Sequence, residues 1–520
     1  MSWAEIYPWE APAPGEPRIH RVYEQLREAI HSGALRPGGR LPSSRDLARR
    51  LGVARASVVA AYERLVGEGY AEGRAGSGTY VSQDLSGVLE LRPARRAPRA
   101  AAPPALPDRV GALEAFDLPE APPEARPFSN GRTLMDERAL DAWSRASRRA
   151  LRTLGPVHFG YSDARGDPRL RAAIADYLRA ARGVVCEPDQ VIVTAGAQHA
   201  VDLAARLLVR PGDPVWLEDP CYDPTWHALG QLGAELHPIP VDGSGIDVAA
   251  GVAAAPDAKM AFVTPSHQFP LGVTLSMARR LELLAWARQA GAFVVEDDYA
   301  SEFRYSGPPL PSLQGLDGGE RVIYVGTLNK ALFPGLRMGY MVAPRPLLKA
   351  LSVERHLTDR QPSSLTQAVL LDFMESGEFA AHIRRRRVAY GRQRDALAQA
   401  LVRRFGDALE ITRPDQGMQL IAYFRDGRSD LEAELAAARA GLSARAISRL
   451  YRKAPPRPGV LLGFSGFPVS AMAAGVERLA AAWSGGSGGA LGLGEDCAPP
   501  DGDADDGDAS RRLSGRVRTR

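Results

Sequence analysis

The segment VGTLNKALFPGLRMGY, residues 325–340, contains Lys330 in a chain whose basic residues are mostly arginine. Lys330 follows a strand-like apolar run and precedes a proline–glycine turn that leads to Arg337. An imine requires a nucleophilic amine that is neutral part of the time, which a buried lysine can supply and an arginine cannot. Arg337 could hold a phosphate as a charged fork, together with Thr327. The alternative is an ordinary surface lysine, as most lysines are.

Polar residues also stand at the ends of earlier apolar runs. FVVEDDYASEF ends a predicted buried strand in three acids, and a buried carboxylate requires a cation. A protonated pyridine nitrogen would be such a cation for Asp297, and Tyr299 could hydrogen-bond a phenolic oxygen on the ring. VIVTAGAQHAV predicts strand, glycine turn and helix, with free N–H groups at Ala197 and Gln198 for a phosphate. Tyr222 of WLEDPCYDP could stack on the ring.

The elements that would position these residues alternate in type. From about residue 128 to 484, the strand-like runs VIVTAG, PVWLEDP, KMAFVTP, FVVEDDY and RVIYVGT are separated by long helical patterns. This alternation predicts an α/β domain with a mainly parallel central sheet.

The phosphate-binding turn, Tyr222, the Asp297-x-Tyr299 strand end and Lys330 with Arg337 follow one another along the chain. This order resembles that of fold-type I aminotransferases over residues 128–484. The resemblance implies pyridoxal 5′-phosphate (PLP) as the cofactor. Lys330 would form the Schiff base, Asp297 would pair with the ring nitrogen, and Tyr299 would contact the phenolic oxygen. The implied phosphate contacts are Arg337, Thr327, Ala197 and Gln198.

Further contacts follow from the same resemblance. Tyr222 would stack on the ring, and His267 and Gln268 are expected close to it. Tyr161, in GYSDARGDPRL, resembles a tyrosine that reaches the phosphate of a neighbouring subunit, which implies a dimer.

Residues 17–82 show a different organisation. The patterns IHRVYEQLREAIHSG, LPSSRDLARRLG and VARASVVAAYERLVGEGY predict three helices with helix-turn-helix spacing, the second capped by Ser43. GYAEGRAGSGTYVS predicts two short strands around a glycine-rich tip, a wing. Arg55 and Ser57 near the start of the third helix could read base edges, and Arg45 could hold a phosphate or a guanine edge. The wing tip that could approach DNA comprises Gly76, Ser77 and Gly78.

This region carries 11 arginines, no lysine and 6 acids, a local net charge of +5 that suits a polyanion partner. The alternative is a three-helix packing module with arginines on a solvated face. LRPGGRLPSSRDLARRLGVARASVVAAYERLVGEGY…GSGTYVS resembles the winged helix-turn-helix domain of GntR-type bacterial regulators. One departure is Ala54-Arg55-Ala56, where that family often has Ser or Thr beside the arginine.

The stretch between the two regions, residues 83–127, contains 9 prolines and 10 alanines and is typical of a linker. Residues 485–520 are rich in Gly and Asp, then Arg, and are expected to be a disordered tail.

The order of these regions, together with the segments VTPSHQFPLGVTLS and EDDYASEFRYSGPPLPSLQGLD, resembles the MocR family of PLP-binding transcriptional regulators. The expected fold is multidomain, an α/β winged helix-turn-helix followed by an α/β aminotransferase-like domain.

Composition excludes other classes. No apolar run approaches the roughly 20 residues of a membrane span, and the N-terminus MSWAEIYPWEAP is unlike a signal peptide, so a cytoplasmic protein is expected. The three cysteines are widely spaced and fit neither a disulfide framework nor a zinc site, so no metal is expected.

Departures from the aminotransferase pattern bear on whether the chain is an enzyme. Asn329 precedes the lysine where the family often has Ser, and Phe269 replaces the Asn before Pro-x-Gly. The position of the arginine that binds a substrate carboxylate is taken by Leu461. Arg457 is nearby, and Pro224 stands where a second carboxylate-binding arginine could occur.

The resemblance and these departures favour a regulator that senses PLP and controls vitamin B6 genes. An amino-acid-responsive regulator or an active transaminase is the alternative, and a residual half-reaction stays open because Lys330 is present. A third reading is a large domain that has lost its cofactor and only dimerises. The expected partners are a double-stranded DNA operator, a second copy in a head-to-tail dimer, and PLP or an amino acid as effector.

Overall fold

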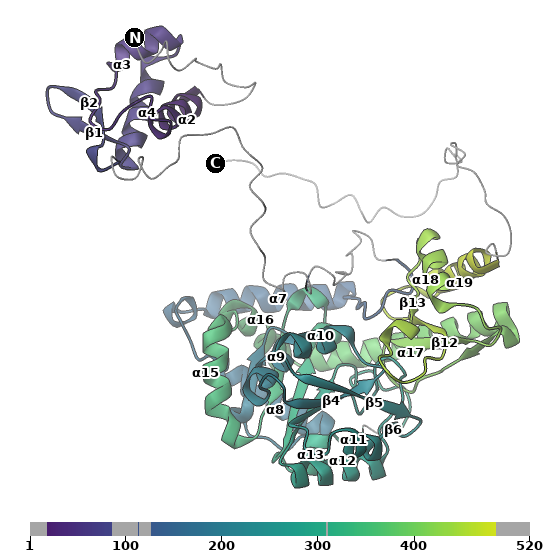
Figure 1. The fold of residues 1–520 in the computed structure, drawn as a ribbon. Helices are drawn as coiled ribbons and strands as arrows, with labels where there is room; N and C mark the ends of the chain where they lie inside the picture. Colours follow the sequence, from purple (N-terminus) through teal and green to yellow (C-terminus); the bar gives the residue numbers. More distant parts are fainter. Residues whose placement is uncertain (1–17, 86–112, 114–125, 308–309, 485–520) are drawn as a thin grey trace. The chain divides into compact units, whose positions relative to one another are not determined.

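The computed structural model of the 520-residue chain describes residues 18–85, 113, 126–307 and 310–484. The chain divides into two units, Met1–Glu120 and Ala121–Arg520 (Figure 1). Most of the predicted linker at residues 83–127 and all of the predicted tail at residues 485–520 lie outside the described residues.

The first unit has the predicted order of three helices and a hairpin. Ser43 caps the second helix by accepting a hydrogen bond from the Asp46 N–H at 3.1 Å, and Gly52 ends that helix in a left-handed conformation with φ 64°. Leu47 and Val58, from the second and third helices, are fully buried in the apolar core. The elements are α2 (Arg18–His31), α3 (Ser44–Leu51), α4 (Arg55–Gly67), β1 (Ala71–Arg74) and β2 (Gly78–Val81).

The second unit is built on an eight-stranded sheet in the order β3-β10-β9-β8-β7-β4-β5-β6. Its central strands β9, β8, β7, β4 and β5 are parallel, β10 runs antiparallel to both of its neighbours, and β6 runs antiparallel to β5. The prediction of a mainly parallel sheet is confirmed. The strands are β3 (Val191–Thr194), β4 (Pro214–Asp219), β5 (Glu235–Asp242), β6 (Gly245–Ile246), β7 (Met260–Val263), β8 (Phe293–Asp298), β9 (Val322–Thr327) and β10 (Gly339–Val342).

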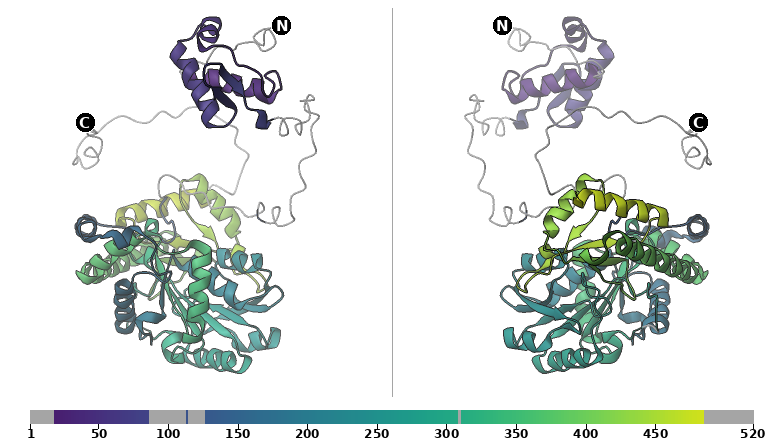
Figure 2. Two further views of the ribbon diagram at one scale, coloured as in Figure 1. Left: turned by 90° about the vertical axis from the view of Figure 1, so that its left-hand side faces the viewer. Right: turned by 90° about the vertical axis from the view of Figure 1, so that its right-hand side faces the viewer.

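Helices cover both faces of this sheet (Figures 1 and 2). Side chains alternate along each strand, so Val215 and Leu217 of β4 pack toward α9, whereas Trp216 points to the other face and stacks on Trp286 of α12 at 3.7 Å between ring centroids. The helices are α7 (Glu137–Thr153), α8 (Pro168–Arg182), α9 (Ala197–Leu208), α10 (Asp223–Gln231), α11 (Val248–Ala254), α12 (Met277–Ala290), α13 (Leu313–Asp317), α14 (Leu328–Ala331), α15 (Leu348–Asp359), α16 (Ser364–Glu375) and α17 (Glu378–Phe405).

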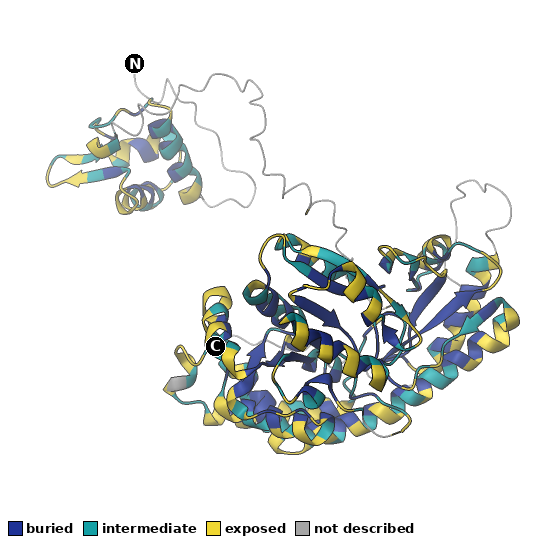
Figure 3. Ribbon diagram, turned by 60° about the horizontal axis from the view of Figure 1, so that its bottom comes forward, coloured by how far each residue is buried: buried dark blue, intermediate teal, exposed yellow. Residues whose placement is uncertain are grey.

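A smaller antiparallel sheet follows, in the order β11-β12-β14-β13, and the sequence did not separate it from the larger one. In Figure 3 the strands of both sheets are buried, while the helices show exposed residues on their outer sides. None of the helices in the described part of the chain has the length and apolar character that a bilayer crossing requires. The added elements are β11 (Leu409–Ile411), β12 (Gln419–Phe424), β13 (Arg445–Ala446), β14 (Gly459–Gly463), α18 (Asp430–Arg439) and α19 (Val469–Ser484).

A buried ion pair fixes the carboxyl end of β8. Arg182, at the end of α8, donates from Nε to Asp298 Oδ2 at 2.7 Å, and the side chains of both residues are at most 5% exposed. The same guanidinium donates to Ser266 Oγ and to the Leu310 carbonyl, each at 2.7 Å. Arg182 therefore joins the end of β8 to the loop after β7, beside the residues predicted to bind a cofactor.

Replacing Arg182 by Met is expected to lower the free energy of unfolding of the large unit by about 3–5 kcal/mol, because Asp298 would stay buried without its cation. Urea unfolding at neutral pH, followed by tryptophan fluorescence, measures the change.

Arg169→Met is the matched control, since its ion pair with Glu375 is exposed and is expected to contribute less than about 1 kcal/mol. Equal losses in the two variants would contradict the role assigned to Arg182.

Candidate cofactor site and nucleic-acid interface

A cavity of about 370 Å³ lies at the carboxyl edge of the large sheet. Ligand sites in open α/β sheets commonly occupy this edge, outside the strand ends. All the predicted cofactor contacts except Tyr161, His267 and Gln268 line this cavity. They are Lys330, Asp297, Tyr299, Tyr222, Ala197, Gln198, Thr327 and Arg337.

Lys330 and Asp297 form the charged centre of the cavity. Burial lowers the pKa of Lys330, and the nearby Asp297 charge raises it in part. Burial also raises the pKa of Asp297 to about 7, with additional contributions from the negative charges of Asp298 and Glu218. The lysine therefore has a larger neutral fraction than an exposed lysine, which favours its use as a nucleophile.

Asp297 lacks a hydrogen-bond partner that its neighbours have. Its Oδ1 is buried without one among the described residues, whereas Asp298 binds Arg182 and Glu296 accepts from the N–H groups of Leu313 and Gln314, each at 3.0 Å. A buried carboxylate oxygen facing a cavity without a donor is the arrangement that a cationic ring N–H would satisfy.

The anion end of the cavity is assembled by the turn before α9 and the segment around Lys330. Gly196 precedes α9 with φ 104°, and the first N–H groups of that helix, at Ala197 and Gln198, have no acceptor within a helix. Arg337 donates to the Ala195 carbonyl at 3.0 Å, which holds its guanidinium beside this turn. A Cβ on Gly196 would lie 3.0 Å from Asn329 Nδ2, so the glycine permits close packing there.

Asn329, a departure from the family pattern, has a structural role. Its Oδ1 accepts from the Met338 N–H at 2.9 Å, and its own N–H donates to Thr327 Oγ1 at 3.2 Å. These bonds fix the short helix α14 that carries Lys330, so the substitution preserves the position of the lysine.

Aromatic residues form one wall. The ring of Tyr222, at the start of α10, packs edge-on against Phe269 at 5.4 Å, and Phe269 packs against Tyr299 at 6.1 Å. Tyr299 accepts a hydrogen bond from Gln419 Nε2 at 3.2 Å. Phe269 thus occupies the place of a polar residue, and Gln419 from the smaller sheet supplies a polar group near Tyr299.

Two residues that sequence reasoning missed, Asn130 and Gly131, also line the cavity. A Cβ on Gly131 would lie 1.9 Å from Lys330 Nζ, so no other residue fits there without displacing the lysine. Only the positive φ of 65° and this contact single out the glycine, and neither is visible in the sequence.

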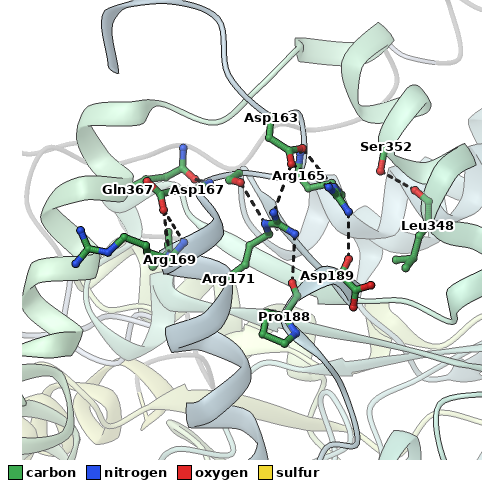
Figure 4. Close-up of polar contacts among 12 residues, drawn as sticks. Asp163, Arg165, Asp167, Arg169, Arg171, Pro188, Asp189, Leu348, Ser352 and Gln367 are labelled. Atoms are coloured by element: carbon green, nitrogen blue, oxygen red, sulfur yellow. Dashed lines mark hydrogen bonds and ion pairs between the residues drawn. The ribbon is translucent and has the colours of Figure 1, made fainter. Parts of the chain in front are cut away.

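Tyr161 lies apart from the cavity of its own chain. Its side chain is 78% exposed, and the Arg360 guanidinium lies 4.1 Å from its ring centroid. The loop after it is well fixed: the Asp163 carboxylate pairs with Arg165 and Arg171, and Arg171 also donates to the Pro188 carbonyl at 3.3 Å (Figure 4).

His267 and Gln268 do not line the cavity. The His267 ring packs behind Tyr299, and a Cβ on Gly417 would lie 2.3 Å from its Nε2. Burial lowers the pKa of His267 to about 4. Gln268 donates to the Pro220 carbonyl at 2.8 Å and to Glu218 at 3.2 Å, which joins the loop after β7 to the end of β4.

The wall near β14 contains a different arginine from the one expected. Leu461 is fully buried in an apolar cluster with Ile421, and Arg457 pairs with Glu410 at 2.6 Å, away from the cavity lining. Arg445 on β13 does line the cavity. The sequence ARAISRL gave no signal for it, because the contact depends on strand register.

In the first unit, the predicted DNA contacts gather at two places. Arg45 and Arg55 are exposed at the starts of α3 and α4, and Arg55 donates to Ser44 Oγ at 3.3 Å, which brings the two helix starts together. Ser57, two residues after Arg55 in the first turn of α4, is partly exposed. The hairpin tip contains Gly76 and Gly78, with φ 73° and 115°, and Ser77 between them.

Other residues on α4 have partners within the first unit. Tyr62 is buried and donates to the Pro42 carbonyl at 2.8 Å, and Arg64 pairs with Glu68 at 2.8 Å. Ala54 gives α4 no side-chain cap. Arg40, which sequence reasoning did not select, lies beside the wing, where a Cβ on Gly78 would be 3.2 Å from its Nε.

Known proteins match both units. Residues 18–81 match the gntR family of bacterial regulatory proteins, and residues 128–451 match aminotransferase class I and II. The chain is 39% identical over 467 residues to the probable rhizopine catabolism regulatory protein MocR of Rhizobium meliloti, covering 90% of this chain and 94% of the relative. The chain belongs to the MocR family of transcriptional regulators. This MocR-type regulator is also 34% identical over 446 residues to the HTH-type pyridoxine biosynthesis transcriptional regulator PdxR of Corynebacterium glutamicum, covering 85% and 91% of the two chains.

The fold of the large unit has counterparts among enzymes. An archaeal alanine:glyoxylate aminotransferase matches with TM-score 0.64 and 27% identity, covering 70% of this chain and 91% of the enzyme. The Pyrococcus horikoshii kynurenine aminotransferase, whose structure contains PMP, matches with TM-score 0.64 and 25% identity, covering 73% and 94%. The predicted fold-type I aminotransferase domain in this MocR-type regulator is confirmed.

Glu218→Gln is expected to reduce the pH dependence of stability in the ligand-free regulator. Burial raises the pKa of Glu218 from 4.5 to about 7, although Thr264 and Gln268 donate hydrogen bonds to it. A raised pKa stabilises the fold at low pH, and this contribution, about 3 kcal/mol for Glu218, is lost as pH rises from about 4.5 through about 7. Urea unfolding at a series of pH values measures it.

Asp297 and Glu296 have pKa values raised to about 7 as well, so the variant is expected to retain part of the decline. Glu375→Gln, at an exposed position, serves as the control. If stability falls with pH equally in Glu218→Gln and in the parent, the assignment to Glu218 is wrong.

Proposed function

We propose that this MocR-type regulator binds PLP covalently through Lys330 and that cofactor occupancy controls its binding to operator DNA. The observation that carries the proposal is the buried pair of Lys330, with its lowered pKa, and Asp297, with its partnerless oxygen. Burial of an amine and of a carboxylate oxygen without a partner costs free energy. An aldehyde attached to a pyridine ring fits both groups, because the amine can react with the aldehyde and the carboxylate can accept from the ring N–H.

The remaining cavity residues fit the same group. When bound, PLP supplies an aldehyde that condenses with an amine and a ring that withdraws electrons. Asp297 would hold the ring N–H, Tyr299 would donate to the phenolic oxygen, and Tyr222 would lie against the ring. The phosphate would be held by the N–H groups of Ala197 and Gln198, by Thr327 and by Arg337.

A head-to-tail homodimer completes the proposal. Tyr161 is exposed and its loop is fixed by ion pairs, which suits a residue that reaches the phosphate site of a second copy. Two winged helices would then bind paired half-sites whose spacing the dimer sets. PLP would change DNA binding only to the extent that it binds one arrangement of the dimer more tightly.

The genes under control are proposed to be those of vitamin B6 metabolism. The support is the similarity to PdxR, which is named for pyridoxine biosynthesis. The second candidate is a regulator that responds to an amino acid. Arg445 on the cavity wall favours it, because a guanidinium can replace the carboxylate-binding arginine that is missing at Leu461.

Lys330→Ala is expected to abolish the absorption band of covalently held PLP and to weaken cofactor binding by at least about tenfold, a loss of about 1.4 kcal/mol. Absorption spectroscopy after dialysis measures the first effect, and equilibrium dialysis the second. In fluorescence anisotropy on the DNA upstream of its own gene, PLP is expected to alter affinity or stoichiometry for the parent but not for this variant.

Lys349→Ala, which removes an exposed lysine of α15, is the matched control and is expected to behave as the parent. Retention of the band in Lys330→Ala would refute attachment at this residue. PLP that binds without any effect on DNA binding, while an amino acid has one, would favour the second candidate.

Arg45→Ala and Arg55→Ala are each expected to weaken operator binding by about 1–3 kcal/mol, roughly fivefold to 150-fold. Anisotropy titrations at several salt concentrations distinguish their roles. A phosphate contact weakens binding to all sequences and lowers the salt slope by about one, whereas a base contact relaxes specificity.

Arg64→Ala is the control for charge, since Arg64 pairs with Glu68, the residue that caps the end of its own helix. A loss of binding in Arg64→Ala as large as in the other two would mean that net charge alone, and not the helix starts, determines the affinity.

A further inference from the structure

A second cavity, of about 250 Å³, lies in the large unit and shares no lining residue with the cofactor cavity. Its walls come from α8, from the segment that follows β8 and from α17. Pockets that hold drug-sized ligands have volumes of roughly 300–1,000 Å³, so this smaller cavity suits an ion or a small metabolite. The charged residues of its lining are Arg182, Glu302, Arg304, Arg384 and Arg387.

Arg384 and Arg387 lie about one helical turn apart on α17, and both line this second cavity. The two arginines between them, Arg385 and Arg386, pair with the carboxylate of Asp136. Arg384 and Arg387, by contrast, are exposed and form no ion pair with any of the described residues. Two guanidinium groups are therefore available at the cavity for an anion that the chain itself does not supply.

The segment after β8 adds polar atoms that are buried without a partner. Glu302 is 6% exposed, and its Oε1 accepts from the Tyr177 hydroxyl at 3.3 Å, whereas its Oε2 has no partner among the described residues. Arg304 Nε is likewise buried without one, although its Nη1 donates to Gln416 Oε1 at 3.3 Å. Arg387 donates from Nε to the Glu302 carbonyl at 2.9 Å, which attaches this segment to α17. A ligand in the cavity could satisfy both partnerless atoms, which otherwise cost free energy.

The side chain of Glu302 does not neutralise these arginines as an ordinary glutamate would. Burial raises the pKa of Glu302, and the nearby negative charge of Asp298 raises it further. A carboxyl that keeps its proton donates a hydrogen bond and adds no negative charge to the cavity. Arg182 is the one arginine of the lining that has a carboxylate partner, because it pairs with Asp298. Arg304, Arg384 and Arg387 thus remain as cations without an ion pair among the described residues.

We propose that this second cavity binds the phosphate group of a small metabolite. Arg384 and Arg387 would bind phosphate oxygens as charged forks, while Arg304 Nε and the protonated Glu302 would donate to the others. A phosphate group presents three acceptor oxygens and nearly two negative charges at neutral pH, so it can engage several guanidinium groups at once. A carboxylate has only two oxygens and one charge. Inorganic phosphate and a phosphate ester share this chemistry, and the site is separate from the one proposed for PLP.

The test uses the full-length protein loaded with PLP, so that the anion end of the cofactor cavity is filled. Isothermal titration calorimetry at fixed ionic strength compares inorganic phosphate, glycerol 3-phosphate and succinate. At least one of the two phosphates is expected to bind more tightly than the dicarboxylate. Binding of glycerol 3-phosphate at least as tight as that of inorganic phosphate identifies an ester as the ligand, whereas a preference of about tenfold for inorganic phosphate identifies the free ion.

Arg384→Leu is expected to weaken phosphate binding by at least about fivefold, because a hydrogen bond between charged groups is lost. Arg392→Leu is the matched control, since Arg392 is exposed on the same helix and lies outside the cavity lining. Its affinity is expected to stay within about twofold of the parent, because solvent screens so distant a charge. Glu302→Gln keeps a donor and is expected to bind phosphate at least as tightly as the parent. Thermal unfolding of each variant verifies that it is folded.

Several outcomes would overturn the proposal: no binding of either phosphate at millimolar concentrations, tighter binding of succinate, equal affinities of Arg384→Leu and the parent, or a tenfold loss in Glu302→Gln. A loss of binding in Arg337→Leu instead of in Arg384→Leu would place the phosphate in the cofactor cavity and would also overturn it. Failure of the parent to hold PLP would refute the proposed function alone, because the comparison of Arg384→Leu with Arg337→Leu does not require PLP.

Discussion

Burial of carboxylates at the carboxyl ends of β4 and β8 is the constraint on which the site depends. Each buried acid requires a donor or a cation. Glu296 takes two backbone N–H groups, Asp298 takes Arg182, and Glu218 takes Thr264 and Gln268. These bonds connect α13, α8 and the loop after β7 to the sheet edge. Of these four acids, Asp297 alone keeps an oxygen without a partner among the described residues, and Asp297 lines the cavity.

Much of this site could be predicted from the sequence because its parts are local. Asp297 and Lys330 each end or follow an apolar run, and their order along the chain matched a known arrangement. Arg445 could not be predicted, because its place depends on the pairing of β13 with β14. His267 was expected near the ring, but the turn after β7 directs it behind Tyr299. Gly131 is distant in sequence from the lysine it contacts.

The two units are stabilised by different kinds of interaction. In the described part of the first unit, Ser82 is the only buried polar residue, and the core of the unit is otherwise apolar. The large unit buries many charged groups, several with raised pKa values. Protonation of these buried carboxyls and binding of a ligand in the cavity therefore change the stability of the large unit.

The contact between Gly131 and Lys330 has a mechanical consequence. Residues 126–131 are where the described chain resumes after residues 114–125, and Asn130 and Gly131 are at the same time part of the cavity wall. The Phe128 carbonyl accepts from the Gly463 N–H at 2.8 Å, so this turn is attached to β14. A movement of the Lys330 amine toward Gly131 would press on a turn that β14 holds, so the smaller sheet limits the positions open to the amine.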